Sequence, residues 1–288
     1  MHSKTAANEL RNPLIDEPGM ADPHVLVLDD DTCYLYTGHD VGVGVSDWVM
    51  PDWQIYRSKT LRDWELVGTI RPEASYMGKG NTSCWAGDIV ARNGKYYWYF
   101  SNRKASTGVM VADRPEGPFQ DALGEPLVDS FDPTVFIDDD GTPYLIYGEV
   151  DYKIARLKDS MVELAEAPRL IEINRKCTFP KTDKNSLHKR NGLYYLGCSG
   201  YYAVSEELYG PYLYRGLVGT GWGLESSFAH GDFFQWQGQW YHVWCKYRNR
   251  DHDRIRDCFI APVRFGSDGS MMDDLTALEQ GAAAYKLM

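Results

Sequence analysis

The sequence has few basic residues and no long apolar run, and both absences exclude classes of partner. Its 30 Lys and Arg are outnumbered by 41 Asp and Glu, which gives a formal net charge of −11, and no long basic run is present. Because nucleic-acid sites depend on clustered positive charge, no nucleic-acid partner is expected. No apolar segment approaches the roughly 20 residues that span a bilayer, so no membrane partner is expected either.

Cysteine occurs in no arrangement that would carry chemistry. The six cysteines are scattered, with no CxxC pair and no metal-ligand spacing. We expect them to be reduced and buried as small apolar side chains. The first residues, MHSKTAANEL, lack the apolar core of a signal peptide. A cytoplasmic location is therefore the default expectation, with secretion or periplasmic export if a signal was removed.

Aromatic residues, by contrast, are abundant and recur in a repeat. A polar turn followed by an aromatic-rich alternating run occurs five times, as DDDTCYLYTG, NGKYYWYFS, DGTPYLIYG, NGLYYLGCSG and QGQWYHVWC. Each copy is typical of a hairpin turn that leads into a strand. One tyrosine aligns in every copy: Tyr34, Tyr97, Tyr144, Tyr195 and Tyr241. These tyrosines are 63, 47, 51 and 46 residues apart, about the length of one four-stranded propeller blade.

The repeat predicts an all-β fold, a five-bladed β-propeller, because helical periodicity is weak throughout. We expect one domain over residues 1–288, with an N-terminal extension over about 1–18. The longer first interval predicts an inserted loop in the first blade, over about 41–76.

Carboxylates recur in register with the repeat. Each repeated hairpin is preceded by another strand, and the first strand of a propeller blade lines the central channel. The positions twelve residues before the aligned tyrosines are Asp22, Trp85, Asp132, Asp183 and Ala229, and His230 follows the last of them. These side chains are therefore expected to meet at one mouth of the channel. Acidic residues also begin turns before Pro, so the register alone does not establish catalysis.

Gathered carboxyls suit the cleavage of a glycosidic bond. One carboxylic acid protonates the leaving oxygen, and one carboxylate activates water or attacks the sugar. A third carboxyl nearby keeps the acid protonated near neutral pH, because like charges raise its pKa.

The segments that carry these residues resemble glycoside hydrolase family 43 over about residues 12–269. The resemblance rests on NPLIDEPGMADPHVLVLDD, WAGDIVARNGKYYWYFS, FDPTVFIDDDGTPYLIYG and FAHGDFFQWQGQWYHVW. It implies a five-bladed propeller that cleaves arabinose-, xylose- or galactose-containing glycans with inversion. It assigns the general base to Asp22, the residue that orients the acid and tunes its pKa to Asp132, and contact with an axial metal ion or water to His230. No cofactor is implied beyond a structural Ca²⁺ or Na⁺ ion on that axis.

The fourth blade departs from the family's pattern. Where the family has a catalytic-acid Glu followed by Gly or Ala, TDKNSLHKRNGLYYL has Asp183 followed by Lys. Three interpretations follow. Asp183 serves as the acid in a reshaped pocket, another residue such as His188 or His39 has taken the role, or the protein binds a glycan without cleaving it.

Further residues are expected to contact the sugar. Trp85 would stack on it, and His39 and Asp40 match the family's His-Asp near the pocket rim. Arg254 and Arg256 alternate on one strand and so face the same way, which would bring a guanidinium into the pocket. The full set of expected substrate-binding residues is Trp85, His39, Asp40, Asp88, His188, Arg254 and Arg256.

We therefore expect an inverting, exo-acting glycosidase that removes a terminal pentose or galactose-type residue from a plant or algal oligosaccharide or polysaccharide. Exo action is inferred from the predicted inserted loop, which would close one end of the pocket. A non-catalytic glycan-binding propeller and a retaining hydrolase or phosphorylase on the same scaffold are the alternatives. The sugar, its linkage and the oligomeric state are left open.

Overall fold

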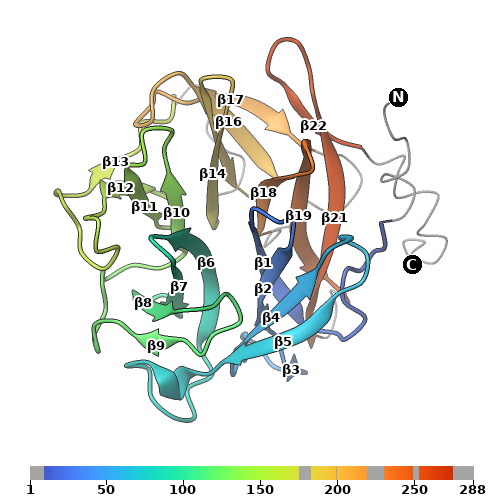
Figure 1. Cartoon of the computed structure of the whole chain (residues 1–288), viewed down its shortest axis with the longest axis vertical. Coiled ribbons are helices and arrows are strands. Elements are labelled where there is room, and N and C mark those ends of the chain that lie inside the picture. The colour runs from blue at the N-terminus through green and yellow to red at the C-terminus, as the bar shows by residue number, and fades with distance from the viewer. Residues whose placement is uncertain (1–9, 175–182, 199, 219–229, 249–252, 275–288) are drawn as a thin grey trace.

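The molecule is a ring of five antiparallel sheets around a central channel (Figure 1). The computed structural model describes residues 10–174, 183–198, 200–218, 230–248 and 253–274. Each sheet has four strands that follow one another outward from the channel, so each is one propeller blade. The predicted all-β, five-bladed propeller is confirmed.

The strand bounds follow the predicted repeat. The first blade contains β1 (Met20–Val27), β2 (Cys33–His39), β4 (Trp53–Ser58) and β5 (Glu65–Ile70). The second contains β6 (Cys84–Arg92), β7 (Lys95–Asn102), β8 (Ser106–Ala112) and β9 (Gln120–Asp121). The third contains β10 (Thr134–Ile137), β11 (Pro143–Tyr147), β12 (Lys153–Arg156) and β13 (Arg169–Leu170). The fourth contains β14 (Asn185–Arg190), β15 (Leu193–Cys198), β16 (Tyr201–Ser205) and β17 (Leu213–Leu217). The fifth contains β18 (Gly231–Trp236), β19 (Gln239–Tyr247), β21 (Arg256–Phe265) and β22 (Met271–Asp273).

The repeated turns join the first and second strands of the blades. Asn93 and Gly94 both have positive φ, as do Asn191 with Gly192 and Gln237 with Gly238. Two successive residues of this kind make a turn whose twist matches that of the flanking antiparallel strands. The aligned tyrosines consequently fall on the second strand of every blade.

The predicted inserted loop over 41–76 is wrong for most of its length. β4 and β5, which lie within it, are the two outer strands of the first blade. The additional elements are β3 (Gly42–Val43) and the short 3-10 helix η1 (Pro72–Ala74). β3 pairs with β20 (Asp253–Arg254), which lies between β19 and β21 in the sequence, and the two form a separate two-stranded sheet. In the described part of the chain, no helix is long and apolar enough to cross a membrane.

The segment before β1 closes the ring against the last blade. The Leu14 N–H donates to the Cys258 carbonyl, and the Asn12 side chain exchanges two hydrogen bonds with the Ile260 backbone. Leu10 and Leu14 are buried in the same core as β1. The described part of the predicted N-terminal extension therefore joins the first blade to the fifth.

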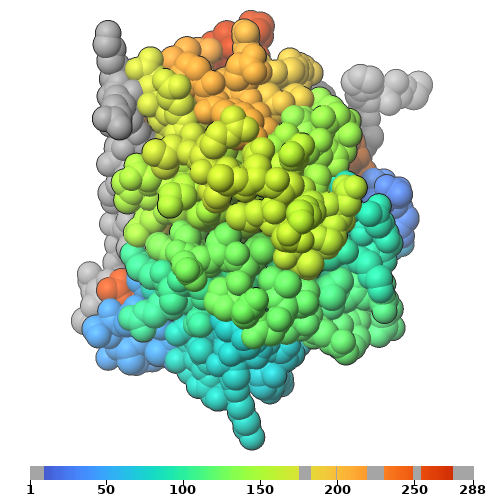
Figure 2. All heavy atoms as spheres, turned by 90° about the vertical axis from the view of Figure 1, so that its left-hand side faces the viewer, coloured from blue at the N-terminus to red at the C-terminus, as the bar shows by residue number. Residues whose placement is uncertain are grey.

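The blades pack through large aromatic side chains. Tyr36 of the first blade stacks on Trp98 of the second, with ring centroids 5.4 Å apart. Phe136 of the third blade meets Tyr194 of the fourth edge-on. Figure 2 shows the outer surface of the second, third and fourth blades as one continuous packed face.

The cysteines in the described residues are free and buried, as predicted. They are Cys33, Cys84, Cys198, Cys245 and Cys258. Cys177 lies outside the described residues.

Candidate active site

A pocket opens at the end of the channel where the inner strands of the blades begin. Its volume is about 170 Å³, well below the roughly 300–1,000 Å³ of pockets for drug-sized ligands. It is lined by Asp22, Trp48, Met50, Trp85, Ala86, Lys104, Phe131, Asp132, Glu149, Asp183, His230 and Arg256. The three aspartates predicted from the repeat, together with Trp85 and His230, thus line one cavity.

Backbone geometry directs two of the aspartates into this pocket. Asp22 and Asp132 both have positive φ, 49° and 58°, which is uncommon for a residue other than glycine. The ladder between β1 and β2 is irregular between Ala21 and His24, around Asp22. The Asp132 N–H donates to the Ser101 hydroxyl, which in turn donates to the Ala86 carbonyl of the second blade. Backbone irregularities of this kind turn a side chain toward a site. Both occur at the Asp-Pro pairs of the sequence, Asp22-Pro23 and Asp132-Pro133.

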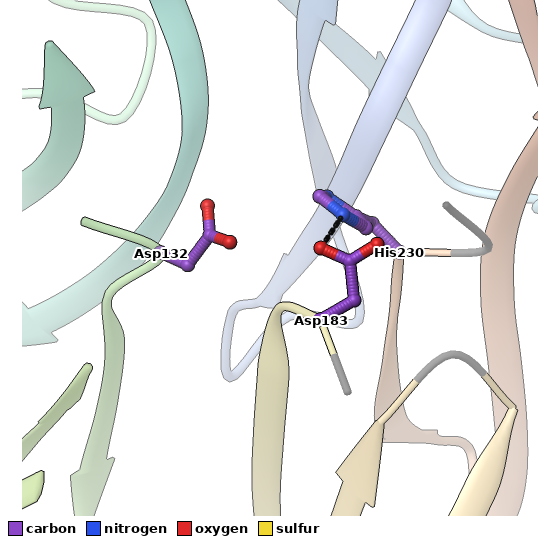
Figure 3. A group of neighbouring side chains, drawn as sticks. All are labelled: Asp132, Asp183 and His230. Atoms are coloured by element: carbon purple, nitrogen blue, oxygen red, sulfur yellow. Dashed lines mark ion pairs between the residues drawn. The ribbon is translucent and has the colours of Figure 1, made fainter. Parts of the chain in front are cut away.

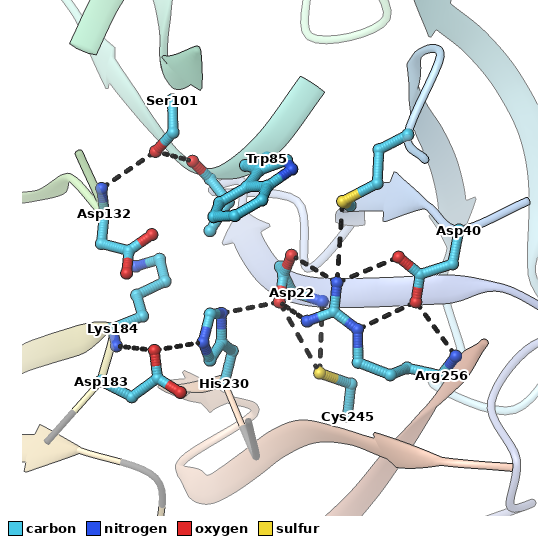
Figure 4. A network of polar contacts seen from close by, with 12 residues as sticks. Asp22, Asp40, Trp85, Ser101, Asp132, Asp183, Lys184, His230, Cys245 and Arg256 are labelled. Carbon is cyan, nitrogen blue, oxygen red and sulfur yellow. Dashed lines mark hydrogen bonds and ion pairs between the residues drawn. The ribbon is translucent and has the colours of Figure 1, made fainter. Parts of the chain in front are cut away.

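Asp22 is held as a carboxylate by two cations. Arg256 donates to both of its oxygens, from Nη1 to Oδ1 at 2.6 Å and from Nη2 to Oδ2 at 3.1 Å. His230 Nδ1 lies 2.7 Å from Oδ1 (Figure 4). Burial alone would raise the pKa of Asp22, but the charges of Arg256 and His230 outweigh it and hold this pKa well below its usual range.

His230 lies between two carboxylates from different blades. Its Nε2 is 2.8 Å from Asp183 Oδ1, and the opposite ring nitrogen contacts Asp22. Burial disfavours the charged ring, but the two carboxylates outweigh it and raise the pKa of His230 well above its ordinary value. The imidazolium in turn lowers the pKa of Asp183 against the effect of burial. Asp22 and Asp183 are therefore separated by one imidazole ring.

Asp132 differs from Asp22 and Asp183 because its pKa is raised and not lowered. A carboxylate oxygen of Asp132, one of Asp183 and a ring nitrogen of His230 all lie within 4.8 Å of one another (Figure 3). Unlike Asp22 and Asp183, Asp132 has no ion pair with a described cation. Burial, together with the charges of Asp183 and Asp22, raises the pKa of Asp132 to about 7. The cluster thus holds an ionised Asp22 and a carboxyl that is partly protonated at neutral pH.

The wall beside Asp22 is built from Arg256, Asp40 and two tryptophans. Asp40 is buried and accepts three hydrogen bonds from Arg256, one from its backbone N–H and two from its guanidinium. The guanidinium carbon lies 5.5 Å from the Trp48 ring centroid. Trp48 and Trp85 meet edge-on, with centroids 5.7 Å apart. Asp40 therefore positions Arg256 and does not line the pocket.

Besides Asp40, four further predicted substrate-binding residues lie away from the pocket lining, which corrects the prediction that they line it. His39 Nδ1 contacts Asp52 at 3.0 Å. Asp88 lies further along β6, where it accepts the Ile89 and Val135 N–H groups and pairs with His24. His188 is buried against Tyr195, Phe233 and Trp240, and burial lowers its pKa to about 3. Arg254 lies against Trp48, with its guanidinium carbon 4.7 Å from the centroid of the Trp48 ring.

Comparison with known proteins decides the family. The model for glycosyl hydrolases family 43 matches residues 10–271. The chain belongs to glycosyl hydrolase family 43. It is accordingly a glycosidase.

Several family 43 relatives extend over nearly the whole chain. A xylosidase/arabinosidase from Bacteroides ovatus is 28% identical, over 88% of this chain and 94% of its own length. A β-xylosidase from Xylanibacter ruminicola is 27% identical, over 87% of this chain and 95% of its own. Among solved structures, the GH43_1 enzyme from Xanthomonas citri superposes with a TM-score of 0.79 at 27% identity, covering 93% of this chain and 94% of that one.

Sequence reasoning missed several residues of this family 43 pocket. Trp48 lies in the segment that was predicted to be an insertion, and Lys104 and Glu149 follow the second strands of the second and third blades. Lys104 and Glu149 form an ion pair of 2.8 Å at the rim. The loops after the second strands return to the same mouth of the channel, but Lys104 and Glu149 follow their aligned tyrosines by 7 and 5 residues, so no single offset in the repeat identifies both.

Asp132, Asp183 and His230 lie close enough together to mark a place for the axial cation suggested by the family resemblance, but a protonated His230 does not fit such an ion. An imidazolium donates from both nitrogens and has no lone pair for a metal ion, and both nitrogens of His230 contact carboxylates. The ammonium of Lys184 is buried beside the same cluster. We therefore derive no step through a metal ion.

Proposed function

We propose that the protein is an inverting, exo-acting glycosidase that releases a terminal xylose or arabinose residue from a plant or algal glycan. The observation that carries the proposal is the placement of Asp22 and Asp183 on opposite sides of His230, at the base of a small pocket. Inversion needs two carboxyls roughly 6.5–9.5 Å apart, so that a water molecule fits between one of them and the sugar.

Asp22 acts as the general base in this proposal. Its two cationic partners keep it ionised, so it accepts a proton from water as the water oxygen attacks the anomeric carbon. The bond from that carbon to the glycosidic oxygen breaks in the same step. The product sugar therefore has the inverted anomeric configuration.

Asp183 delivers a proton to the departing glycosidic oxygen. Its Oδ1 accepts the Lys184 N–H at 3.0 Å and contacts His230, which leaves Oδ2 for the leaving group. Asp183 and Asp132 are close enough that their ionisations oppose each other, so the proton belongs to the pair. Asp132 keeps that proton available near neutral pH.

Exo action and pentose preference are supported by the pocket wall and by the relatives. Trp48 and Trp85 close one side of a cavity that suits a single sugar unit, and the Lys104–Glu149 pair lies at its rim. The enzyme from Xanthomonas citri has been crystallised with xylose and with xylotriose. Both curated relatives named above are xylosidases, one of them also an arabinosidase.

The test is hydrolysis of aryl β-D-xyloside, α-L-arabinofuranoside and galactosides, followed by xylotriose, with the product anomer observed by NMR at early times. We expect turnover of the pentosides and stepwise release of xylose with inverted configuration. Release of the retained anomer would contradict the mechanism. Thermal stabilisation by sugars without any product would indicate a binding protein, and turnover that requires phosphate would indicate a phosphorylase.

The pH dependence of kcat/KM follows from the different pKa values of Asp132 and Asp22. Because the pKa of Asp132 is raised to about 7, kcat/KM should fall about tenfold per pH unit above that value, as the shared proton is lost. The acidic side should stay flat, because the pKa of Asp22 lies well below its usual range. In Asp132→Asn the alkaline fall should move to lower pH. A profile that stays level through pH 8, with the fold intact at each pH, would contradict the shared proton.

A further inference from the structure

A lysine ammonium is buried next to the carboxyl cluster, and the mechanism above does not use it. Lys184 follows Asp183 at the start of the fourth blade and is only 2% exposed. Its Nζ donates to the Thr134 hydroxyl at 3.1 Å and to the Asn185 carbonyl at 3.2 Å. It forms no ion pair with a carboxylate of the described residues, and Figure 4 shows its chain running between Asp183 and Asp132.

A buried charge is costly unless its surroundings compensate it. The direct contacts of Lys184 are neutral oxygens, so the compensation must come from charges further away. Asp132 lies on one side, and its pKa is pulled down by Lys184 against the larger effect of burial. Asp88, deeper along β6, also interacts electrostatically with Lys184. The ammonium therefore lies among carboxylates as a bound cation would.

The oxygens around Lys184 are of the kind that bind hard metal ions. Ca²⁺ prefers hydroxyl, carbonyl and carboxylate oxygens, and the neighbourhood offers the Thr134 hydroxyl, the Asn185 carbonyl and the Asp132 carboxylate. Thr134 Oγ1 itself donates to the Asn185 carbonyl at 2.8 Å, and the Asn185 amide donates to the Asp132 carbonyl at 3.0 Å. These contacts join the third and fourth blades around the ammonium.

We propose that Lys184 is the resident cation of the channel, and that its ammonium takes the place a metal ion would otherwise fill. Two consequences follow. The wild-type protein neither binds Ca²⁺ at this position nor depends on it, and shortening Lys184 opens a Ca²⁺ site made of the oxygens that it now contacts. The inference concerns the site of the proposed function, but its binding and stability consequences do not depend on turnover.

The experiment compares wild type with Lys184→Ala, Lys184→Met and the exposed control Lys59→Ala. Each protein is treated with EDTA and titrated with CaCl₂ by calorimetry and by thermal unfolding. Wild type and Lys59→Ala should show no binding heat and an unchanged Tm. Lys184→Ala should bind Ca²⁺, with a Tm rise of about 5 °C when Ca²⁺ is at a hundredfold excess over Kd. Lys184→Met removes the charge but fills the space, so it should not gain this response.

Each outcome decides the proposal. If wild type itself binds Ca²⁺ and is stabilised as much as Lys184→Ala, Lys184 is not the resident cation. If folded Lys184→Ala shows no response to Ca²⁺, the proposal is equally overturned. If Lys184→Ala folds only when CaCl₂ is present during refolding, the proposal is supported, and failure to refold in either condition counts against it. None of these readouts uses a glycoside, so an inactive wild type would refute the proposed function and leave this inference standing.

Discussion

Replacing Asp22 with Asn is expected to lower kcat on xylosides by about 10²–10⁴-fold, the usual contribution of one acid–base group. The amide is nearly the same size but cannot accept the proton of the attacking water. Arg256 and His230 would still surround it, so the pocket keeps its shape while it loses the base. Steady-state rates on an aryl xyloside and on xylobiose measure the effect.

The contrasting variant is Asp183→Asn, which removes the proton donor instead. Activated aryl leaving groups need little protonation, so its loss should be small on an aryl xyloside and large on xylobiose, whereas Asp22→Asn should be impaired on both. Asp159→Asn, a surface change far from the pocket, controls for altered charge. Near wild-type turnover by folded Asp22→Asn on both substrates would remove Asp22 from the mechanism.

The second large effect is on stability. Arg256→Met is expected to lower the free energy of unfolding by about 3–5 kcal/mol, because removing one partner of a buried ion pair leaves uncompensated charge. Arg256 bridges Asp22 and Asp40, and all three side chains are buried. Urea unfolding at neutral pH measures the loss.

A matched control lies on the same strand. Arg264 of β21 pairs with Asp274, but its side chain is exposed, so Arg264→Met should cost about 1 kcal/mol or less. Without Arg256 the pKa values of Asp22 and Asp40 should rise, so protonation in the acidic range should return part of the lost stability. Equal small losses from the two variants, or a loss that does not depend on pH, would contradict the interpretation of Arg256 as the clamp of two buried carboxylates.

The number of blades could be predicted from the sequence, because a short hairpin pattern occurs five times. The same pattern predicted that Asp22, Asp132, Asp183 and His230 would converge. An Asn-Gly turn between two alternating runs specifies a hairpin locally, and five hairpins at blade spacing leave little choice of architecture. Residues at one offset from these hairpins then reach the same end of the channel. The outer strands β4 and β5 were misjudged because they carry no such turn signal, and their spacing alone resembled an insertion.

How far along the channel a side chain lies, and which residues it contacts, could not be predicted from the repeat. Asp88 is three residues beyond Trp85 on one strand, and that distance takes it out of the pocket and into contact with His24. Arg254 and Arg256 both lie against Trp48, but only Arg256 reaches Asp22. Which one reaches it depends on how β20 and β21 lie against the first blade.

The sequence by itself determined the propeller, its turns and the positions at which carboxyls converge, because those features depend on periodicity and on local backbone preference. Only the tertiary structure decided the charge state of the cluster. The two cations beside Asp22, the burial of Asp132 and the ammonium of Lys184 come from different blades. A pKa depends on distance and burial in three dimensions, and neither quantity is encoded in the spacing of residues along the chain.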